Sequence, residues 1–304
     1  MTSEIINIEN WGKCLKLSNG KIEITTTLDL GPRIIGFNLI GGQNFLNQIG
    51  KVDPTETPWG NYYNYGGHRL WHSPEALPRT YYPDNDPIKY ELTGTGAIFF
   101  YNTEVANGID KKFEIVLGDG ETVEIKHTIT NVGHFPLKIA PWALTIMAPG
   151  GELIVPNEPF IPHTDCLLPA RPLVLWHYTN MADPRWTWGE KFTCLRNDSS
   201  IDKAMKVGFL DKVGWAAYKL KDSVFIKSFD YVEGAEYPDY MCNLETFTKA
   251  TFHEFETVAP LSELAPNGGS ADYVEKWSLF DNVKMTRDED NMADVLSGLV
   301  KKIK

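Results

Sequence analysis

Apolar residues along this chain recur mainly in short runs with the two-residue period of β-strands. The segment 21–27 (Lys-Ile-Glu-Ile-Thr-Thr-Thr) alternates polar and apolar side chains and then passes into β-branched residues. Most runs are about five to nine residues long and rich in Val, Ile, Thr, Phe and Tyr, which is typical of strands. Further runs of this kind lie at 33–39, 97–101, 112–117, 122–130, 216–220, 224–229, 251–258 and 272–280.

Turn signals such as Asn19-Gly20 and Asp119-Gly120 separate these runs. Many short strands joined by regular turns indicate a sandwich or barrel rather than alternating strand and helix units. A helix is predicted at 289–302, because apolar residues fall on one face there, and we expect it to pack across the outside of the sandwich. The chain is therefore predicted to be all-β with a C-terminal helix, and to form one domain over residues 1–304.

Composition and net charge limit the classes of partner that the chain is expected to bind. The formal net charge is −11, and the basic residues that cluster are the terminal Lys301, Lys302 and Lys304. A nucleic-acid binder usually carries a basic stripe, so neither nucleic acid nor an anionic membrane is expected as a partner. The N-terminus lacks the pattern of a secretory signal, and the four cysteines form no C-x-x-C pair. We expect a cytoplasmic chain with free thiols, no metal site and no cofactor, as a monomer or homodimer.

Two stretches depart from the strand pattern, at 54–87 and 156–191. The first mixes five Tyr, two Trp and two His with six Pro, and the second combines His, Arg, Trp and Pro. Long ordered loops in a compact β-domain are uncommon unless they build a site. Aromatic rings contact the C–H faces of sugars, and His, Arg and acidic groups bond their hydroxyls. The predicted ligand is therefore a carbohydrate.

The motif at 66–72 (Gly-Gly-His-Arg-Leu-Trp-His) belongs to the first stretch. In an extended segment His68 and His72 would share one face, and Arg69 and Trp71 the other. The two histidines would line a pocket, or one would be a structural residue and the other a surface residue. A metal site formed by them is a lesser alternative, because no acidic ligand lies at a diagnostic spacing.

The second stretch offers Arg185, Trp186, Trp188 and His163. Trp186 and Trp188 would share a face, while Arg185 would point away from them. They either contact a ligand or form a core plug in which Arg185 pairs with an acid. His163 lies between prolines and is a candidate general acid, or simply an exposed loop residue.

Glu245 is the candidate general base. Alternation would place it on one face of a strand with Asn243 and Phe247. A surface position is the alternative. Glu254 and Glu256 alternate with apolar residues and are expected to be solvent-facing or structural.

Several segments resemble the galactose mutarotase-like (aldose 1-epimerase) superfamily. They read YGGHRLWHSPE at 65–75, YPDNDP at 82–87, DPRWTWG at 183–189, YPDYMCNLETFT at 237–248 and VEKWSLF at 274–280. The resemblance implies an antiparallel β-supersandwich with a sugar cleft on its concave face. It also implies ring opening at an anomeric carbon without a cofactor, with Glu245 withdrawing the proton of the C1 hydroxyl and a His protonating the ring oxygen.

One departure from the family pattern concerns the acid. The segment 138–144, where that His is expected, contains none, and Trp142 or a neighbour takes its place. The proton would come from His163, His68 or His72, or the chain would bind a sugar without catalysis. A lyase or hydrolase ranks last, since Asp239 is the one carboxylate near Glu245 that could form a pair. The predicted substrate-binding residues are His72, Arg69, Trp71, Trp142, Arg185, Trp186, Trp188, Lys227 and Asp239.

Overall fold

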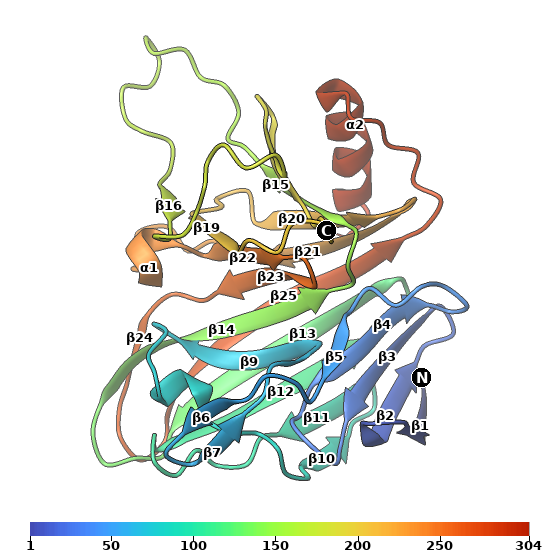
Figure 1. The fold of residues 1–304 in the computed structure, drawn as a ribbon, viewed down its shortest axis with the longest axis vertical. Helices are drawn as coiled ribbons and strands as arrows, with labels where there is room; N and C mark the ends of the chain where they lie inside the picture. The colour runs from blue at the N-terminus through green and yellow to red at the C-terminus, as the bar shows by residue number, and fades with distance from the viewer. Residues whose placement is uncertain (304) are drawn as a thin grey trace.

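Two large antiparallel sheets, stacked face to face, form the body of the protein (Figure 1). The computed structural model describes residues 1–303; Lys304, the last residue of the basic cluster, lies outside the described residues. The first sheet runs in the order β1 (Thr2–Ile8), β2 (Gly12–Ser18), β3 (Ile22–Thr27), β4 (Ile34–Leu39), β9 (His68–Ser73), β14 (Leu137–Met147), β23 (Phe252–Val258), β22 (Leu244–Lys249), β19 (Met205–Phe209) and β16 (Leu173–Leu175), with β24 (Ser262–Leu264) paired to β14.

The second sheet packs against the inner face of the first. Its order is β10 (Lys89–Leu92), β11 (Gly96–Phe100), β12 (Ile109–Leu117), β13 (Thr122–Asn131), β25 (Gly269–Phe280), β21 (Ser223–Phe229), β20 (Trp215–Leu220), β15 (Glu152–Pro156), β18 (Phe192–Arg196) and β17 (Trp186–Trp188). Two small ribbons pair β5 (Gln48–Gly50) with β8 (Tyr65–Gly66) and β6 (Thr55–Thr57) with β7 (Gly60–Tyr62). The predicted all-β class is confirmed.

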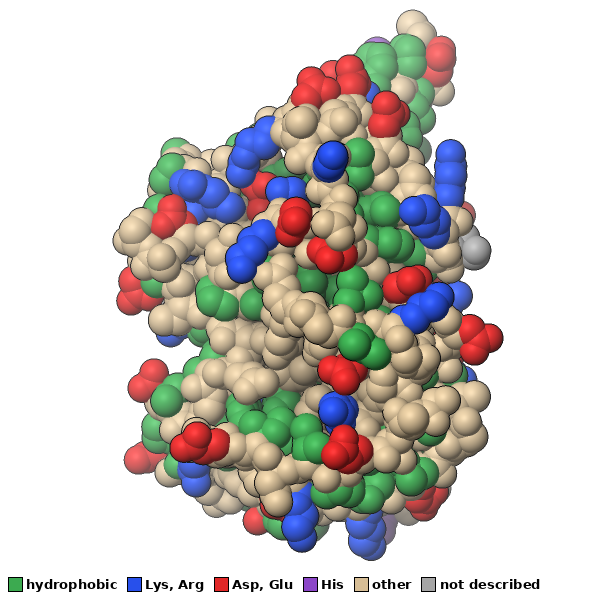
Figure 2. Space-filling view, turned by 90° about the vertical axis from the view of Figure 1, so that its right-hand side faces the viewer, with side chains coloured by type: hydrophobic (Ala, Val, Ile, Leu, Met, Phe, Trp, Pro, Cys, Tyr) green, Lys and Arg blue, Asp and Glu red, His purple; other side chains and the backbone are tan. Residues whose placement is uncertain are grey.

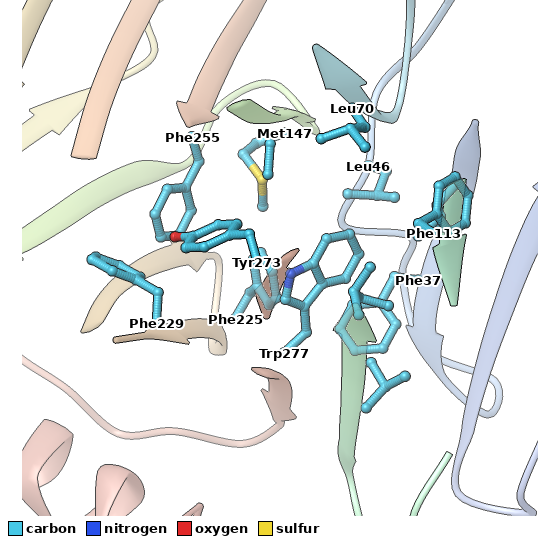
Figure 3. Close-up of a cluster of buried hydrophobic side chains, with 14 of the residues drawn as sticks. Phe37, Leu46, Leu70, Phe113, Met147, Phe225, Phe229, Phe255, Tyr273 and Trp277 are labelled. Carbon is cyan, nitrogen blue, oxygen red and sulfur yellow. The ribbon is translucent and has the colours of Figure 1, made fainter. Parts of the chain in front are cut away.

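Aromatic side chains fill the space between the sheets (Figure 3). Phe37, Phe225 and Trp277 form a triangle of edge contacts, with ring centroids 5.5–5.7 Å apart. Over residues 270–277 of β25, buried positions alternate with exposed ones, as the period-two pattern requires. Edge contacts of this kind stabilise a core beyond the area that they bury.

Helices are few among the described residues: the 3₁₀ turn η1 (Arg79–Tyr81), α1 (Pro238–Met241) and α2 (Glu289–Val300). The buried face of α2 packs on the outer face of the second sheet through Met292, Leu296 and Leu299, which confirms the predicted external brace. Asp288 caps the helix by accepting a hydrogen bond from the Asn291 backbone N–H. Over residues 1–303, no helix has the length and apolar character needed to cross a membrane.

Gly96 marks a close approach of two strands. A Cβ atom there would lie 1.7 Å from the backbone oxygen of Ile115. We expect Gly96→Ala to lower the free energy of unfolding by about 1–3 kcal/mol, because strand backbone must move to accept the methyl group. Gly94→Ala is the matched control, since a Cβ at Gly94 meets nothing within 4 Å. Equal urea midpoints for the two variants would contradict the expectation.

Candidate functional site

A cleft lies on the outer face of the first sheet, over β9, β14, β23, β22 and β19. It consists of two cavities of about 290 and 450 Å³. The cavities share five wall residues: Thr55, Glu75, Tyr81, Trp142 and Lys206. Because these walls are common to both, we treat the cavities as one cleft.

Strand register decides which side chains form the cleft floor. Trp142 lies opposite Trp71, and Leu144 lies opposite both Arg69 and Glu256. Residues directly opposite in an antiparallel pair project from the same face. The same rule brings Glu245, Phe247, Glu254 and Lys206 to this face, through the pairs Glu245–Glu256, Phe247–Glu254 and Lys206–Phe247.

The two unusual stretches of the sequence supply the cleft walls. The stretch 54–87 contributes Thr55, Tyr62, Asn64, Glu75 and Tyr81. The stretch 156–191 contributes Trp176 to the larger cavity and Tyr178 to the smaller one. Aromatic rings and hydrogen-bonding groups therefore line the same space.

Lys206 is the charged centre of the floor. Its Nζ lies 2.8 Å from Glu245 Oε2 and 3.1 Å from Glu256 Oε2. The same atom sits over the rings of Trp142 and Trp176, at 4.7 and 4.8 Å from their centroids. Burial alone would lower the pKa of Lys206, but the two carboxylates outweigh burial and raise it well above its ordinary value. Lys206 is therefore a fixed cation that lines both cavities.

Glu245, the sequence-predicted base, lies beneath the cleft. Its side chain is completely buried and lines neither cavity, and it contacts Lys206, which lines both. Burial raises the pKa of the Glu245 carboxyl to about 8, with Glu256 adding to the effect and Lys206 opposing it. A ligand would meet the Lys206 ammonium before it met this carboxylate.

Glu254 is the floor carboxylate that a ligand can reach. It lines the smaller cavity, and its Oε1 lies 3.5 Å from Arg69 Nη2. Burial, reinforced by Glu256, raises the pKa of Glu254 to about 7 although Arg69 and Lys206 oppose the shift. A carboxyl group that is half ionised near neutral pH can both accept and donate a proton.

Arg69 and Trp71 occupy the places predicted for them on the cleft face. The Arg69 guanidinium lies over the Trp71 ring, 4.6 Å from its centroid. Its Nε and Nη1 atoms are buried and have no hydrogen-bond partner within the described chain, and the same is true of Tyr62 Oη. Unpartnered donors in a cavity wall are groups that a ligand can satisfy.

The predicted pocket histidines point the other way. Successive side chains of β9 point to opposite faces of the sheet. Because Arg69 and Trp71 face the cleft, His68 and His72 face the second sheet. His68 Nε2 lies 2.8 Å from His127 Nε2, and His72 Nε2 lies 3.0 Å from Glu104 Oε2. Both imidazoles are fully buried between the sheets, so neither is in a position to protonate a ligand in the cleft.

Lys227 is also a core residue rather than a cleft residue. Its Nζ lies 2.9 Å from Glu275 Oε1 and donates to Thr145 Oγ1 and the Phe255 carbonyl. Ligand atoms of His68, His127 and Glu275 all lie within 4.8 Å of one another, as in a metal site. However, the two imidazoles are at hydrogen-bonding distance, and the Glu275 carboxylate accepts from Trp277 Nε1 at 3.1 Å as well as pairing with Lys227. The residues fit a satisfied polar network better than a cation site.

Arg185 is a structural residue that pairs with an acid, which was the second of the two alternatives predicted for it. Its Nε and Nη2 donate to the two carboxylate oxygens of Asp183 at 2.9 and 3.0 Å, and it is buried. Trp186 and Trp188 do share a face, with ring centroids 4.5 Å apart, but they lie on the edge of the second sheet. None of the three lines the cleft cavities.

His163 lies on the long connection between β15 and β16, which projects from the top of the molecule in Figure 1. It is exposed. The same connection carries four exposed apolar side chains, and Figure 2 shows hydrophobic side chains gathered on the top projection. These are Phe160, Ile161, Leu167 and Leu168.

Of the residues predicted from the sequence, Arg69, Trp71, Trp142 and Asp239 line the cleft, and Glu245 lies under it. Sequence reasoning missed Lys206 and assigned Glu254 and Glu256 to solvent-facing or structural positions. A usable signal was present for Glu254 and Glu256, because the pairing of strands 244–249 and 252–258 across a short turn places them beside Glu245. Lys206 stands in a short apolar run that gave no such signal.

The arrangement defines a β-supersandwich with a cleft on the outer face of one sheet. No protein-family model and no curated protein sequence matches the chain. Its structure is similar to a TPR-domain containing protein from Parabacteroides distasonis, with a TM-score of 0.62, 15% identity, and coverage of 90% of this chain and 48% of the other. The chain thus spans about half the length of that protein.

Two shorter proteins align over almost their whole length. A galactose mutarotase-like protein from Clostridium acetobutylicum has a TM-score of 0.54 and 11% identity, with coverage of 92% of this chain and 99% of the other. One from Lactobacillus casei has a TM-score of 0.51 and 12% identity, with coverage of 88% and 100%. The chain has the galactose mutarotase-like fold, as the sequence resemblance predicted.

Proposed function

We propose that the cleft binds a carbohydrate and catalyses the interconversion of its anomers by ring opening and reclosure at C1, in the manner of an aldose 1-epimerase. One observation carries the proposal. Glu254, with a carboxyl pKa of about 7, lines an aromatic-walled cavity beside the unpartnered donors of Arg69. The similarity of fold to galactose mutarotase-like proteins supports the same class of ligand.

The walls suit a sugar ring. Trp71 and Trp142 present rings at 5.5 Å centroid separation, and Tyr81 packs edge-on to Trp71 at 5.0 Å. Such rings contact the C–H faces of a pyranose, while Arg69 and Tyr62 donate hydrogen bonds to its hydroxyl oxygens. The binding step therefore uses groups that have no other partner in the described chain.

Glu254 supplies the base in this proposal, in place of Glu245. As the bond between C1 and the ring oxygen breaks, its ionised form would take the proton of the C1 hydroxyl while solvent water gives a proton to the ring oxygen. On closure the hydroxyl formed from the ring oxygen loses its proton to water as it attacks C1, and protonated Glu254 returns a proton to the C1 oxygen. Arg69 keeps part of the Glu254 population ionised through its contact at 3.5 Å. Lys206 holds a positive charge beside the site. This charge compensates the negative charge of the buried Glu245 and Glu256 carboxylates.

Exchange between sugar anomers, followed by saturation-transfer NMR over several aldoses, tests the proposal. We expect the protein to accelerate exchange of at least one aldose, and Glu254→Gln to reduce that acceleration about 100-fold or more. The exposed Glu263→Gln on β24 is the matched control and should behave as wild type. If Glu245→Gln abolishes exchange while Glu254→Gln does not, Glu245 is the base as the family resemblance implied.

Binding without catalysis is the second candidate function. It is favoured because no histidine lines the cleft among residues 1–303, so the ring oxygen lacks the expected proton donor. In that case calorimetry would detect saturable sugar binding, weakened in Trp142→Ala, while anomer exchange would proceed at the rate in buffer. Absence of both binding and exchange would contradict either function.

A further inference from the structure

The cleft carries an excess of negative charge, from carboxylates in its lining that have no cationic partner in the described chain. Within the described residues, its floor and walls hold two cationic side chains, Arg69 and Lys206, against six carboxyl groups. Two of the six, Glu254 and Glu245, are partly protonated near neutral pH, because their pKa values are raised to about 7 and 8. Four of the carboxylates line the cavities and two lie directly beneath them. They are Asp53, Glu75, Asp239 and Glu254 in the lining, and Glu245 and Glu256 beneath.

Both cations already have acidic partners in the floor. Lys206 pairs with Glu245 and Glu256 at 2.8 and 3.1 Å, and Arg69 faces Glu254 at 3.5 Å. The remaining lining carboxylates have no ion-pair partner in the described chain. Of these, Glu75 and Asp239 line the larger cavity together with Trp142 and Trp176. Negative charge and aromatic faces in one cavity both favour a cationic group.

An independent observation shows that the adjoining cavity is built for a ligand with oxygen acceptors. Tyr62 is only 4% exposed and lines this cavity, yet its hydroxyl has no hydrogen-bond partner within the described chain. Arg69 Nε and Nη1 are likewise buried and have no hydrogen-bond partner within the described chain. A buried donor without a hydrogen-bond partner destabilises the protein, so hydroxyl oxygens of a bound molecule are the expected partners.

We infer that the cleft takes an amino sugar, with its hydroxyls at Arg69 and Tyr62 and its ammonium group beside Glu75 and Asp239. The inference rests on the proposed carbohydrate function and specifies its substrate class. A neutral sugar would leave the two carboxylates without a counter-charge. A sugar phosphate would bring more negative charge to a cleft whose own cations are paired, and would be repelled.

Calorimetric titration with sugars matched in stereochemistry tests this inference. The first series is glucosamine, glucose, N-acetylglucosamine and glucose 6-phosphate, and the second is the corresponding galactose series. All are titrated at a pH where the amine is protonated. We expect the amino sugar of one series to bind at least about tenfold more tightly than its neutral counterparts, and the phosphate to bind most weakly. High salt should reduce this preference, because it screens exposed charges.

Two single substitutions assign the preference to the larger cavity. Glu75→Gln and Asp239→Asn should each lower the affinity for the amino sugar about threefold or more and leave the affinity for the neutral sugar within about twofold. Glu9→Gln, an exposed position on the β1–β2 turn, makes the same charge change as Glu75→Gln and should alter neither affinity.

The outcomes separate the two proposals. Equal binding of amino and neutral sugars, or tighter binding of the phosphate, would overturn the amino-sugar inference and leave the carbohydrate function standing. A preference for amino sugars that survives both substitutions would overturn the assignment to Glu75 and Asp239. If no sugar of either series binds, both the inference and the proposed function fail.

Discussion

Replacing Lys206 by methionine is expected to lower the free energy of unfolding by about 3–5 kcal/mol, because it leaves buried carboxylates without their counter-ion. Lys206 is the basic group within ion-pair distance of both Glu245 and Glu256 in the described chain, and both acids are fully buried. Methionine preserves much of the volume against Trp142 and Trp176 but not the charge. Urea unfolding monitored by tryptophan fluorescence gives the change.

The loss of unfolding free energy in Lys206→Met should depend on pH. Above pH 8 the Glu245 carboxyl is ionised and the variant is destabilised most. At lower pH Glu245, whose pKa burial raises to about 8, takes up a proton and relieves the repulsion. Lys138→Met is the control, since its pair with Glu236 lies at the surface and such pairs contribute at most about 1 kcal/mol. If Lys206→Met lowers the free energy of unfolding by no more than Lys138→Met does, the buried carboxyls need no counter-ion.

The fold followed from the sequence because period-two alternation is a local property. Runs such as 21–27 and 122–130 became β3 and β13 with small changes at the ends. Alternation also assigned Arg69 and Trp71 correctly to one face and His68 and His72 to the other. It could not say which face is the cleft, because all six residues of β9 are buried by sheet on one side and by loops on the other.

The site was harder to predict because its electrostatics are non-local. Lys206 lies on β19, its partners Glu245 and Glu256 come from β22 and β23, and nothing near it in the sequence indicates a buried ion pair. The same holds for His127, which alternates along β13 like an ordinary inward residue until β9 brings His68 against it. Residue type and spacing identified the strands that carry the chemistry, whereas the pairing of strands decided which charges meet.

The paired histidines between the sheets form a chain of hydrogen bonds that fixes their protonation. Lys227 Nζ donates to Thr145 Oγ1, so the Thr145 hydroxyl is left to donate to His68 Nδ1. His68 must then carry its proton on Nε2 and donate to His127 Nε2, and His127 donates from Nδ1 to the Tyr273 carbonyl. Every step requires neutral imidazoles. Burial lowers the pKa of His127 to about 4, with Lys227 adding to the effect and Glu275 opposing it. Burial, reinforced by His127 and Lys227, lowers the pKa of His68 well below its usual value.

Acid should therefore destabilise the fold through these residues. A histidine with a pKa near 6.5 in the unfolded chain and about 4 in the folded one binds its proton more readily when unfolded. Stability from neutral His127 is complete above pH 6.5 and is lost as the pH falls toward 4, by about 3 kcal/mol in all. Glu245 and Glu254 act in the opposite sense, because their raised pKa values make the folded chain take up protons first. The contribution of His127 must accordingly be measured as a difference between variants.

We expect the unfolding free energy of wild type, relative to His127→Gln, to fall by about 3 kcal/mol between pH 7 and pH 4, because glutamine can hydrogen-bond at this position but does not titrate. Urea unfolding at half-unit pH intervals gives both curves, and their difference removes the opposing carboxyl contributions. His134→Gln is the control, since this imidazole is exposed and its removal should leave the pH dependence unchanged. A difference curve for His127→Gln that is flat across this range would mean that the buried pair accepts a proton in the folded protein, and the neutral hydrogen-bond chain from Lys227 to Tyr273 would then be wrong.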